Sequence, residues 1–76
     1  MNQEEKVISV IGEFVDEGIE VCAEDELKNI GIDSMKKVGV IVKLEETLGI
    51  QFEDADLNPS EINAVQDVIT LVSNYL

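Results

Sequence analysis

The residues from Ser34 to Leu48 have apolar side chains at helical spacing, and Gly49 follows directly. Apolar positions three and four residues apart fall on one side of an α-helix. A glycine just after the last of them is a natural helix end. The sequence therefore predicts a helix over 34–48. Its apolar side is expected to contain Met35, Val38, Ile41, Val42, Leu44 and Leu48.

Two other segments show the same spacing and predict a first and a last helix. The first runs from Gln3 to Val15. The last opens at Asn63, with Gln66 three residues later in an arrangement like a capping box. Between these two segments, Pro59 lies near the start of a polar run and indicates a short helical turn that precedes the last helix. The apolar residues expected in the two helices are Val7, Ile8, Ile11, Phe14 and Val15, then Val65, Val68, Ile69, Val72 and Leu76.

Residues 16–33 lack this spacing and predict a long connection, with an acidic run at 24–26. A connection of this length in so short a chain is usually functional. Leu27, Ile30 and Ile32 are apolar residues near its end. We expect these three to anchor the connection to the core, so that it is ordered.

The expected fold is all-α: a small four-helix bundle with three main helices and one short helix, in a single domain over 1–76. A chain of this size buries only about 60% of the surface of its unfolded state, so its helices must pack efficiently. Apolar residues make up 45% of the chain and aromatic residues only 4%. The core is therefore expected to be aliphatic, and an elaborate active-site cleft is not expected.

The charge and the missing residue types exclude several functions. Seventeen acidic residues against five lysines give a net charge of -12, and nucleic acids and anionic membranes repel such a chain. It contains no histidine, which is the commonest general base. No segment approaches the roughly 18 apolar residues of a membrane span. These features favour a soluble, cytoplasmic monomer that is not an enzyme and that binds proteins rather than nucleic acid or membranes.

Metal and thiol chemistry are not expected either. Cys22 is the only cysteine, so it forms no internal disulfide or cysteine zinc site. It is expected to be a small hydrophobic residue of the core or the connection. The spacing of Asp54 and Asp56 is that of the start of a calcium loop, but Pro59 stands where such a loop needs glycine.

Ser34 is the residue of most direct chemical interest. One interpretation is a helix N-cap, a position where serine is preferred and stabilises the helix by about 1 kcal/mol. The other is an attachment point, because a phosphodiester on this hydroxyl would lie at the positive end of the helix, close to free backbone N–H groups. Taken alone, the residue type favours the cap.

The surrounding sequence resembles a family signature. The run LKNIGIDSM (27–35) is similar to the leucine-x-x-leucine-glycine-x-aspartate-serine-leucine signature of acyl and peptidyl carrier proteins. The order of the expected helices, the chain length and the acidity are similar as well. The resemblance implies an acyl-carrier-like fold and a carrier that holds acyl or aminoacyl intermediates as thioesters on a 4'-phosphopantetheine arm.

This resemblance also implies roles for individual residues and partners. A magnesium-dependent phosphopantetheinyl transferase would attach the arm to Ser34, and Asp33 would be the acidic neighbour that this transferase recognises. Acyl or aminoacyl ligases and downstream synthase or tailoring enzymes are the other implied partners. Methionine at position 35 is close in volume to the leucine of the family. The residues implied to dock partners are Met35, Lys36, Lys37, Val38, Gly39 and Ile62.

The lysines depart from the carriers of fatty acid synthesis, whose second helix is typically acidic. From 34 to 44 there is no acidic residue, and Lys36, Lys37 and Lys43 lie there. One interpretation is a solvated face whose lysines soften the negative field. The other is a docking helix that selects different partners. This second interpretation places the chain, as a discrete carrier, in secondary-metabolite or nonribosomal peptide biosynthesis.

Two alternatives stay open. The first keeps the fold and assigns the chain to primary fatty acid synthesis or to D-alanine transfer. The second is an acidic helical module that binds a basic protein and carries no prosthetic group.

Overall fold

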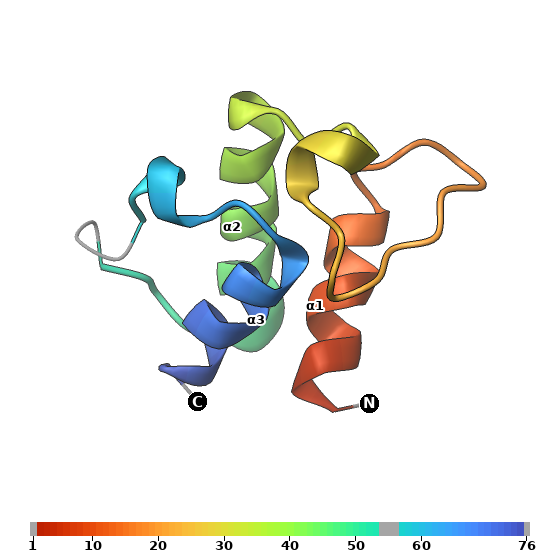
Figure 1. The fold of residues 1–76 in the computed structure, drawn as a ribbon. Helices are drawn as coiled ribbons and strands as arrows, with labels where there is room; N and C mark the ends of the chain where they lie inside the picture. The colour runs from red at the N-terminus through yellow and green to blue at the C-terminus, as the bar shows by residue number, and fades with distance from the viewer. Residues whose placement is uncertain (1, 54–56, 76) are drawn as a thin grey trace.

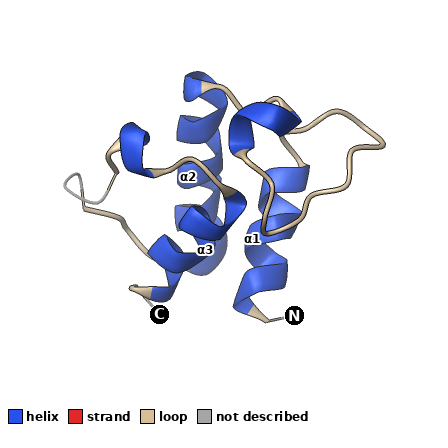
Figure 2. Ribbon diagram, viewed as in Figure 1, coloured by secondary structure: helices blue, strands red, loops and turns tan. Residues whose placement is uncertain are grey.

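The computed structural model describes residues 2–53 and 57–75, and within these ranges the protein is helical (Figures 1 and 2). α1 packs against both α2 and α3. The described residues form no strand, which confirms the all-α class with three main helices and a short one near 59–61; η1 is an additional short helix. The elements in chain order are α1 (Gln3–Gly12), the 3-10 helix η1 (Leu27–Ile30), α2 (Ser34–Leu48), the 3-10 helix η3 (Pro59–Glu61) and α3 (Val65–Ser73).

α1 ends at Gly12, so the expected end at Val15 is wrong by three residues. The last turn tightens, because the Glu13 N–H donates to the Val10 carbonyl three residues back at 3.1 Å. Glycine in the last position has a high entropy cost in a helix, which favours ending there. Phe14 and Val15 still pack against the core, but from the turn that follows the helix.

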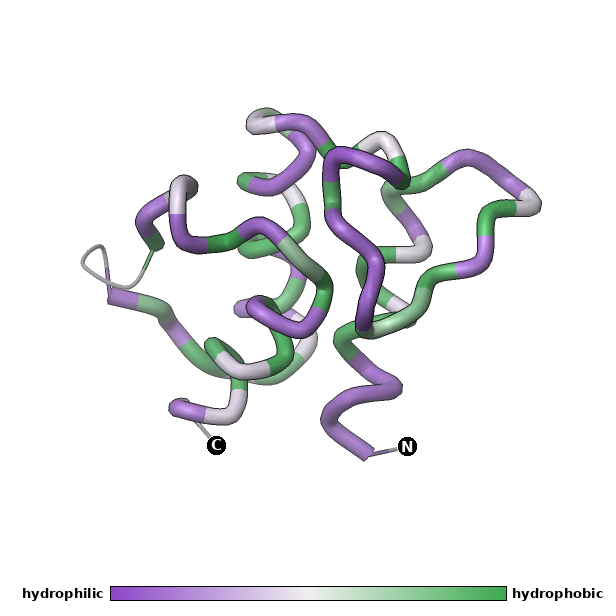
Figure 3. The backbone as a smooth tube through the Cα atoms, viewed as in Figure 1, coloured by the Kyte–Doolittle hydropathy of each residue, from purple (hydrophilic) through white to green (hydrophobic). Residues whose placement is uncertain are grey.

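The core is aliphatic, as expected, and is formed by residues from every helix and from the long connection. Hydrophobic and hydrophilic residues alternate along the helices, as they do where one side of a helix is buried (Figure 3). Phe52 is the one aromatic residue among the buried core residues of the described ranges. The largest fully buried side chains are Ile11, Leu27, Ile32, Leu44, Val7, Val65, Val68 and Val72.

α2 has the expected bounds, but only part of its expected apolar side is buried. Ile41 and Leu44 are in the core, as expected. Val40 is buried as well, although it was not placed on the apolar side. This helix is apolar on two sides, so spacing alone does not decide which side faces the core. The apolar residues on its exposed side are Met35, Val38 and Val42.

Gly39 lies in the middle of α2 because the ring of Phe14 packs onto the helix backbone there. A Cβ atom added at Gly39 would be 2.7 Å from Cε2 of Phe14. That distance is well inside van der Waals contact, so a side chain at 39 would displace the ring. Packing against Phe14 therefore accounts for a residue that lowers helix stability by about 1 kcal/mol relative to alanine.

The long connection after α1 is ordered and is tied to the start of α3. The N–H groups of Val65 and Gln66 donate to the carbonyls of Asp25 and Ala23 at 2.9 and 3.0 Å. The connection thereby satisfies backbone donors that a helix start leaves free. The prediction that three apolar residues anchor the connection is confirmed, because the exposed fractions are 1% for Leu27, 7% for Ile30 and 1% for Ile32.

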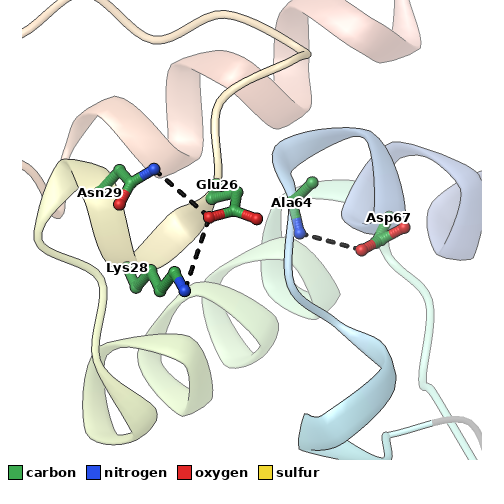
Figure 4. A network of polar contacts seen from close by, with 5 residues as sticks. All are labelled: Glu26, Lys28, Asn29, Ala64 and Asp67. Atoms are coloured by element: carbon green, nitrogen blue, oxygen red, sulfur yellow. Dashed lines mark hydrogen bonds and ion pairs between the residues drawn. The ribbon is translucent and has the colours of Figure 1, made fainter.

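α3 begins at Val65, so the expected start at Asn63 is wrong by two residues. The carboxylate of Asp67 accepts a hydrogen bond from the backbone N–H of Ala64 at 2.9 Å (Figure 4). It also accepts one from the backbone N–H of Asn63 at 3.0 Å. Asp67 therefore has the role expected of Gln66, whose side chain instead donates to Thr70 at 3.4 Å. Leu76, expected in the core, lies outside the described residues, as do Asp54 and Asp56.

The segment after α2 is held in place through both the backbone and the ring of Phe52. Gly49 has a φ of 67°, the left-handed conformation of a helix C-cap. The Phe52 N–H donates to Glu45 Oε2 at 2.9 Å. The Phe52 ring meets the Tyr75 ring edge to face at 4.9 Å. The Tyr75 hydroxyl also accepts from the Glu53 N–H at 2.9 Å, so this segment is fixed to the end of α3.

Candidate functional site

Ser34 is the first residue of α2, and it is not the helix cap. The cap is Asp33, whose Oδ1 accepts a hydrogen bond from the Lys36 N–H at 2.9 Å. The Ser34 side chain is exposed and makes no hydrogen bond within the described part of the chain. The structural role that serine most often has at a helix start is thus performed by its neighbour.

The backbone before Ser34 is fixed by a tight turn. Gly31 has a φ of 86° and caps η1 in the left-handed conformation. The Ile32 N–H then donates to the Leu27 carbonyl at 2.9 Å, and the Ile32 side chain is buried. The hydroxyl of Ser34 therefore projects from a rigid frame.

An apolar cavity of about 180 Å³ lies beside Ser34. One wall is a row along α2 that includes Ser34, Val38, Ile41 and Glu45, spaced four, three and four residues apart. Such residues share one side of a helix over three turns. The opposite wall comes from the connection, from the segment around η3 and from α3. It consists of Leu27, Ile32, Leu57, Ile62 and Val68.

A second, polar hollow of about 430 Å³ also borders Ser34. Ser34, Ile32 and Lys37 line both spaces, so the hydroxyl stands between an apolar and a polar environment. Glu26 and Lys28 line the polar hollow and pair at 3.7 Å, and the Glu26 carboxylate also accepts a hydrogen bond from Asn29, outside the lining, at 3.3 Å (Figure 4). The other residues of the hollow are Asp33 and Asn63.

The residues expected to dock partners are placed differently from one another. Met35 and Val38 are 84% and 63% exposed, and Lys36 is exposed while Lys37 is half-buried. The last two expected docking residues face inward. Gly39 is half-buried beneath Phe14, and Ile62 is 7% exposed and lines the apolar cavity.

Sequence reasoning missed Glu45 and Leu57 as residues of this site. The signal for Glu45 was available, because it continues the row of Ser34, Val38 and Ile41 by four residues. No signal identified Leu57, because no helical spacing in the sequence links it to the other residues of the site.

Cys22 lies in the connection and is exposed. Its pKa is raised above the ordinary value, first by loss of hydration and then by the negative charges of Asp25, Glu20 and Glu24. Since the thiolate is the reactive form, a raised pKa makes this thiol less nucleophilic at neutral pH. None of the helices in the described ranges is both long and apolar enough to cross a membrane.

The order and packing of these helices are those of the acyl carrier protein fold. Residues 5–72 match the family model described as "Phosphopantetheine attachment site". The chain belongs to this family, whose prosthetic group is 4'-phosphopantetheine.

Individual relatives agree with the family. The chain is 33% identical over 74 residues to acyl carrier protein 3, chloroplastic, of Hordeum vulgare, covering 95% of this chain and 54% of the relative. It is 39% identical over 49 residues to an acyl carrier protein homolog of Ureaplasma parvum serovar 3, covering 58% and 64%. The chain thus spans less than two thirds of the length of these curated relatives.

A solved structure has the same fold. It is a chain of the crystal structure of Bradyrhizobium japonicum glycine:[carrier protein] ligase complexed with glycylated carrier protein. The TM-score is 0.77 at 15% sequence identity, with 91% of this chain and 96% of that chain covered.

Proposed function

We propose that Ser34 carries 4'-phosphopantetheine and that the protein is a carrier of acyl or aminoacyl groups rather than a catalyst. The observation that carries this proposal is the exposed Ser34 hydroxyl, which has no hydrogen bond to any described residue and is not the helix cap. In a family defined by phosphopantetheine attachment, a serine with this freedom is the group suited to modification.

The surroundings of Ser34 fit such a group. The N-terminus of α2 favours the negative charge of a phosphodiester on this hydroxyl. The polar hollow beside it offers amide, ammonium and carboxylate groups to a polar arm. When bound, the arm supplies a terminal thiol that holds the cargo as a thioester, so the protein itself needs no nucleophile or general base. This accounts for a carrier without histidine.

For the cargo, we favour an aminoacyl group in secondary-metabolite or nonribosomal peptide biosynthesis. The structural neighbour is a glycylated carrier in complex with its ligase, which supports an aminoacyl ligase as partner. The basic first turns of α2 support a set of partners different from those of an acidic docking helix. Asp33 is the neighbour that we propose the transferase recognises.

The apolar cavity favours a second candidate, a short acyl chain such as one from fatty acid synthesis. An engineered protein cavity of about 150 Å³ binds benzene, so the cavity of about 180 Å³ has room for a chain of about six carbon atoms. An aminoacyl group keeps its charged ammonium out of such a space, because burying an unpaired charge is costly.

The test is loading of the modified protein. The full chain is co-expressed with a promiscuous phosphopantetheinyl transferase, and its intact mass is expected to rise by one phosphopantetheine. The modified protein is then offered to purified glycine, D-alanine and fatty acyl ligases, each with ATP and its substrate. Loading by an amino acid ligase supports the first candidate, and loading only by the fatty acyl ligase supports the second. A mass that never changes with competent transferases overturns the carrier function.

Two substitutions of Asp33 separate its role as the cap of α2 from its proposed role in recognition by the transferase. Asp33→Ala is expected to lower the free energy of unfolding by about 1 kcal/mol, because the bond to the Lys36 N–H is lost. Asp33→Asn keeps a good cap and removes the charge, so stability is expected to stay within about 0.5 kcal/mol. Urea unfolding measures both. Recognition of the charge predicts slower transferase modification in Asp33→Asn, and an unchanged rate would leave Asp33 with the cap alone.

A further inference from the structure

The first turns of α2 present two rows of side chains to solvent. The apolar row is Met35, Val38 and Val42, which are 84%, 63% and 46% exposed. The basic row is Lys36 and Lys43, both exposed. In each row the end residues are seven positions apart, nearly two turns, so each row is about 10 Å long. The two rows run along the helix about a third of a turn apart, on either side of Gly39, onto which the ring of Phe14 packs.

Val38 and Val42 also line the apolar cavity, but the core does not explain why the apolar row is exposed. Its three members are three of the four large apolar residues that are exposed in the described part of the chain; Ile19 is the fourth. Single exposed apolar residues are normal, whereas contiguous ones mark interaction sites. The row starts at the residue directly after Ser34, so a protein that reaches this hydroxyl meets the row as well.

Helix stability does not explain Lys36, one of the two residues of the basic row. A lysine in the first turn opposes the helix dipole by about 0.3 to 1 kcal/mol, and Lys36 lies there. The charge pattern is also local. The segment 34–44 holds three of the five lysines and no acidic residue, while all seventeen acidic residues lie in the rest of the chain.

We propose that the two rows form one docking surface and that its partner is a protein with an apolar surface bordered by carboxylates. The apolar row would be covered by the partner, and the ammonium groups of Lys36 and Lys43 would pair with its carboxylates. This inference rests on the proposed carrier function in one respect: the docking surface would serve to bring an enzyme to Ser34. The proposed partner is acidic at the contact, whereas the net charge of -12 alone would favour a basic partner.

Screening reconciles an acidic partner with an acidic protein. At about 0.15 M salt the Debye length is about 8 Å, so exposed charges on other faces of the molecule contribute little at the contact. At about 0.01 M salt it is about 30 Å, and the whole negative field then opposes association. Binding at this surface is therefore expected to strengthen as salt rises from the lower to the higher concentration, the reverse of attraction between opposite net charges.

The probe is a pair of amphipathic helical peptides with the same leucine face. Glutamates border this face in one peptide, and lysines replace them in the other. Each is titrated into the 15N-labelled apo protein at 0.15 M salt, and amide shifts are followed by NMR. Because the apo protein is sufficient, failure of this inference is distinct from failure of phosphopantetheine attachment.

Charge reversal provides the matched comparison. Lys36→Glu with Lys43→Glu changes the net charge from -12 to -16, since each reversal adds two negative charges. Lys6→Glu with Lys28→Glu gives the same net charge of -16 and leaves both rows intact. Urea unfolding of each variant checks that the fold is kept, and a glutamate at 36 suits the helix start.

The expected result is that the glutamate peptide shifts amides of the apolar row. Reversal of the basic row is expected to weaken binding of this peptide about three- to tenfold, as the loss of two exposed ion pairs implies. The control double variant is expected to weaken it by less than about twofold. Three outcomes would overturn the proposal: no shifts along α2, a lysine peptide that binds more tightly to this face, or equal weakening by the two double variants.

Discussion

Ser34→Ala is expected to abolish phosphopantetheine attachment completely while changing the free energy of unfolding by less than about 0.5 kcal/mol. The side chain is exposed and makes no hydrogen bond within the described ranges, and the helix keeps its cap on Asp33. Alanine is also the best helix former for the first position of α2. Intact mass after co-expression with a transferase, together with urea unfolding, measures both parts of this prediction.

Ser9→Ala is the matched control, because Ser9 is an exposed serine in α1. Its modification is expected to stay at the level of the natural chain. Modification of the Ser34→Ala variant would mean that another hydroxyl accepts the group. A large loss of stability in that variant would mean instead that the hydroxyl has a structural partner.

Leu27→Ala is expected to lower the free energy of unfolding by about 3 kcal/mol, within the range for leucine truncation in a core. Leu27 is 1% exposed, its N–H donates to the Asn63 carbonyl, and its carbonyl accepts from Ile32. The total stability of a chain of this length is about 4 to 11 kcal/mol. Urea unfolding followed by circular dichroism is expected to show an earlier midpoint with little change in slope.

Met35→Ala provides the contrast on the other side of the site. Met35 is 84% exposed, so the same kind of truncation leaves no cavity, and stability is expected to change by less than about 0.5 kcal/mol. Equal effects of the two substitutions would show that the connection is not anchored by Leu27. The expected difference therefore measures how firmly the segment before Ser34 is held.

The helices could be predicted from the sequence where local signals decide. α2 runs from Ser34 to Leu48 as expected, because Gly49 stops it and the apolar spacing is continuous. The ends of α1 and α3 could not be predicted as well. Phe14 and Val15 continue the apolar spacing beyond Gly12, where α1 ends, because they pack against the core from the turn that follows. The start of α3 is set by Asp67 rather than by its neighbour Gln66.

The site shows the same limit. The neighbours of Ser34 in the sequence indicate its importance, but its two interpretations are a helix cap and an attachment point, and the first depends on which residue caps α2. That question is geometric, since both aspartate and serine are good caps, and the structure assigns the cap to Asp33. The exposure of Met35, Val38 and Val42 was not predictable either, because it depends on which side of α2 meets α1 and α3.

The contact between Phe52 and Tyr75 gives the protein a built-in optical reporter. Tyr75 is the only tyrosine, and the chain has no tryptophan, so its emission is not overlaid by that of another strong fluorophore. Its ring and hydroxyl hold the segment at Phe52 and Glu53, and that segment is bonded to Glu45 on the wall of the apolar cavity. If the proposed acyl cargo enters this cavity, we expect the tyrosine fluorescence to change, and this can be measured with no added label.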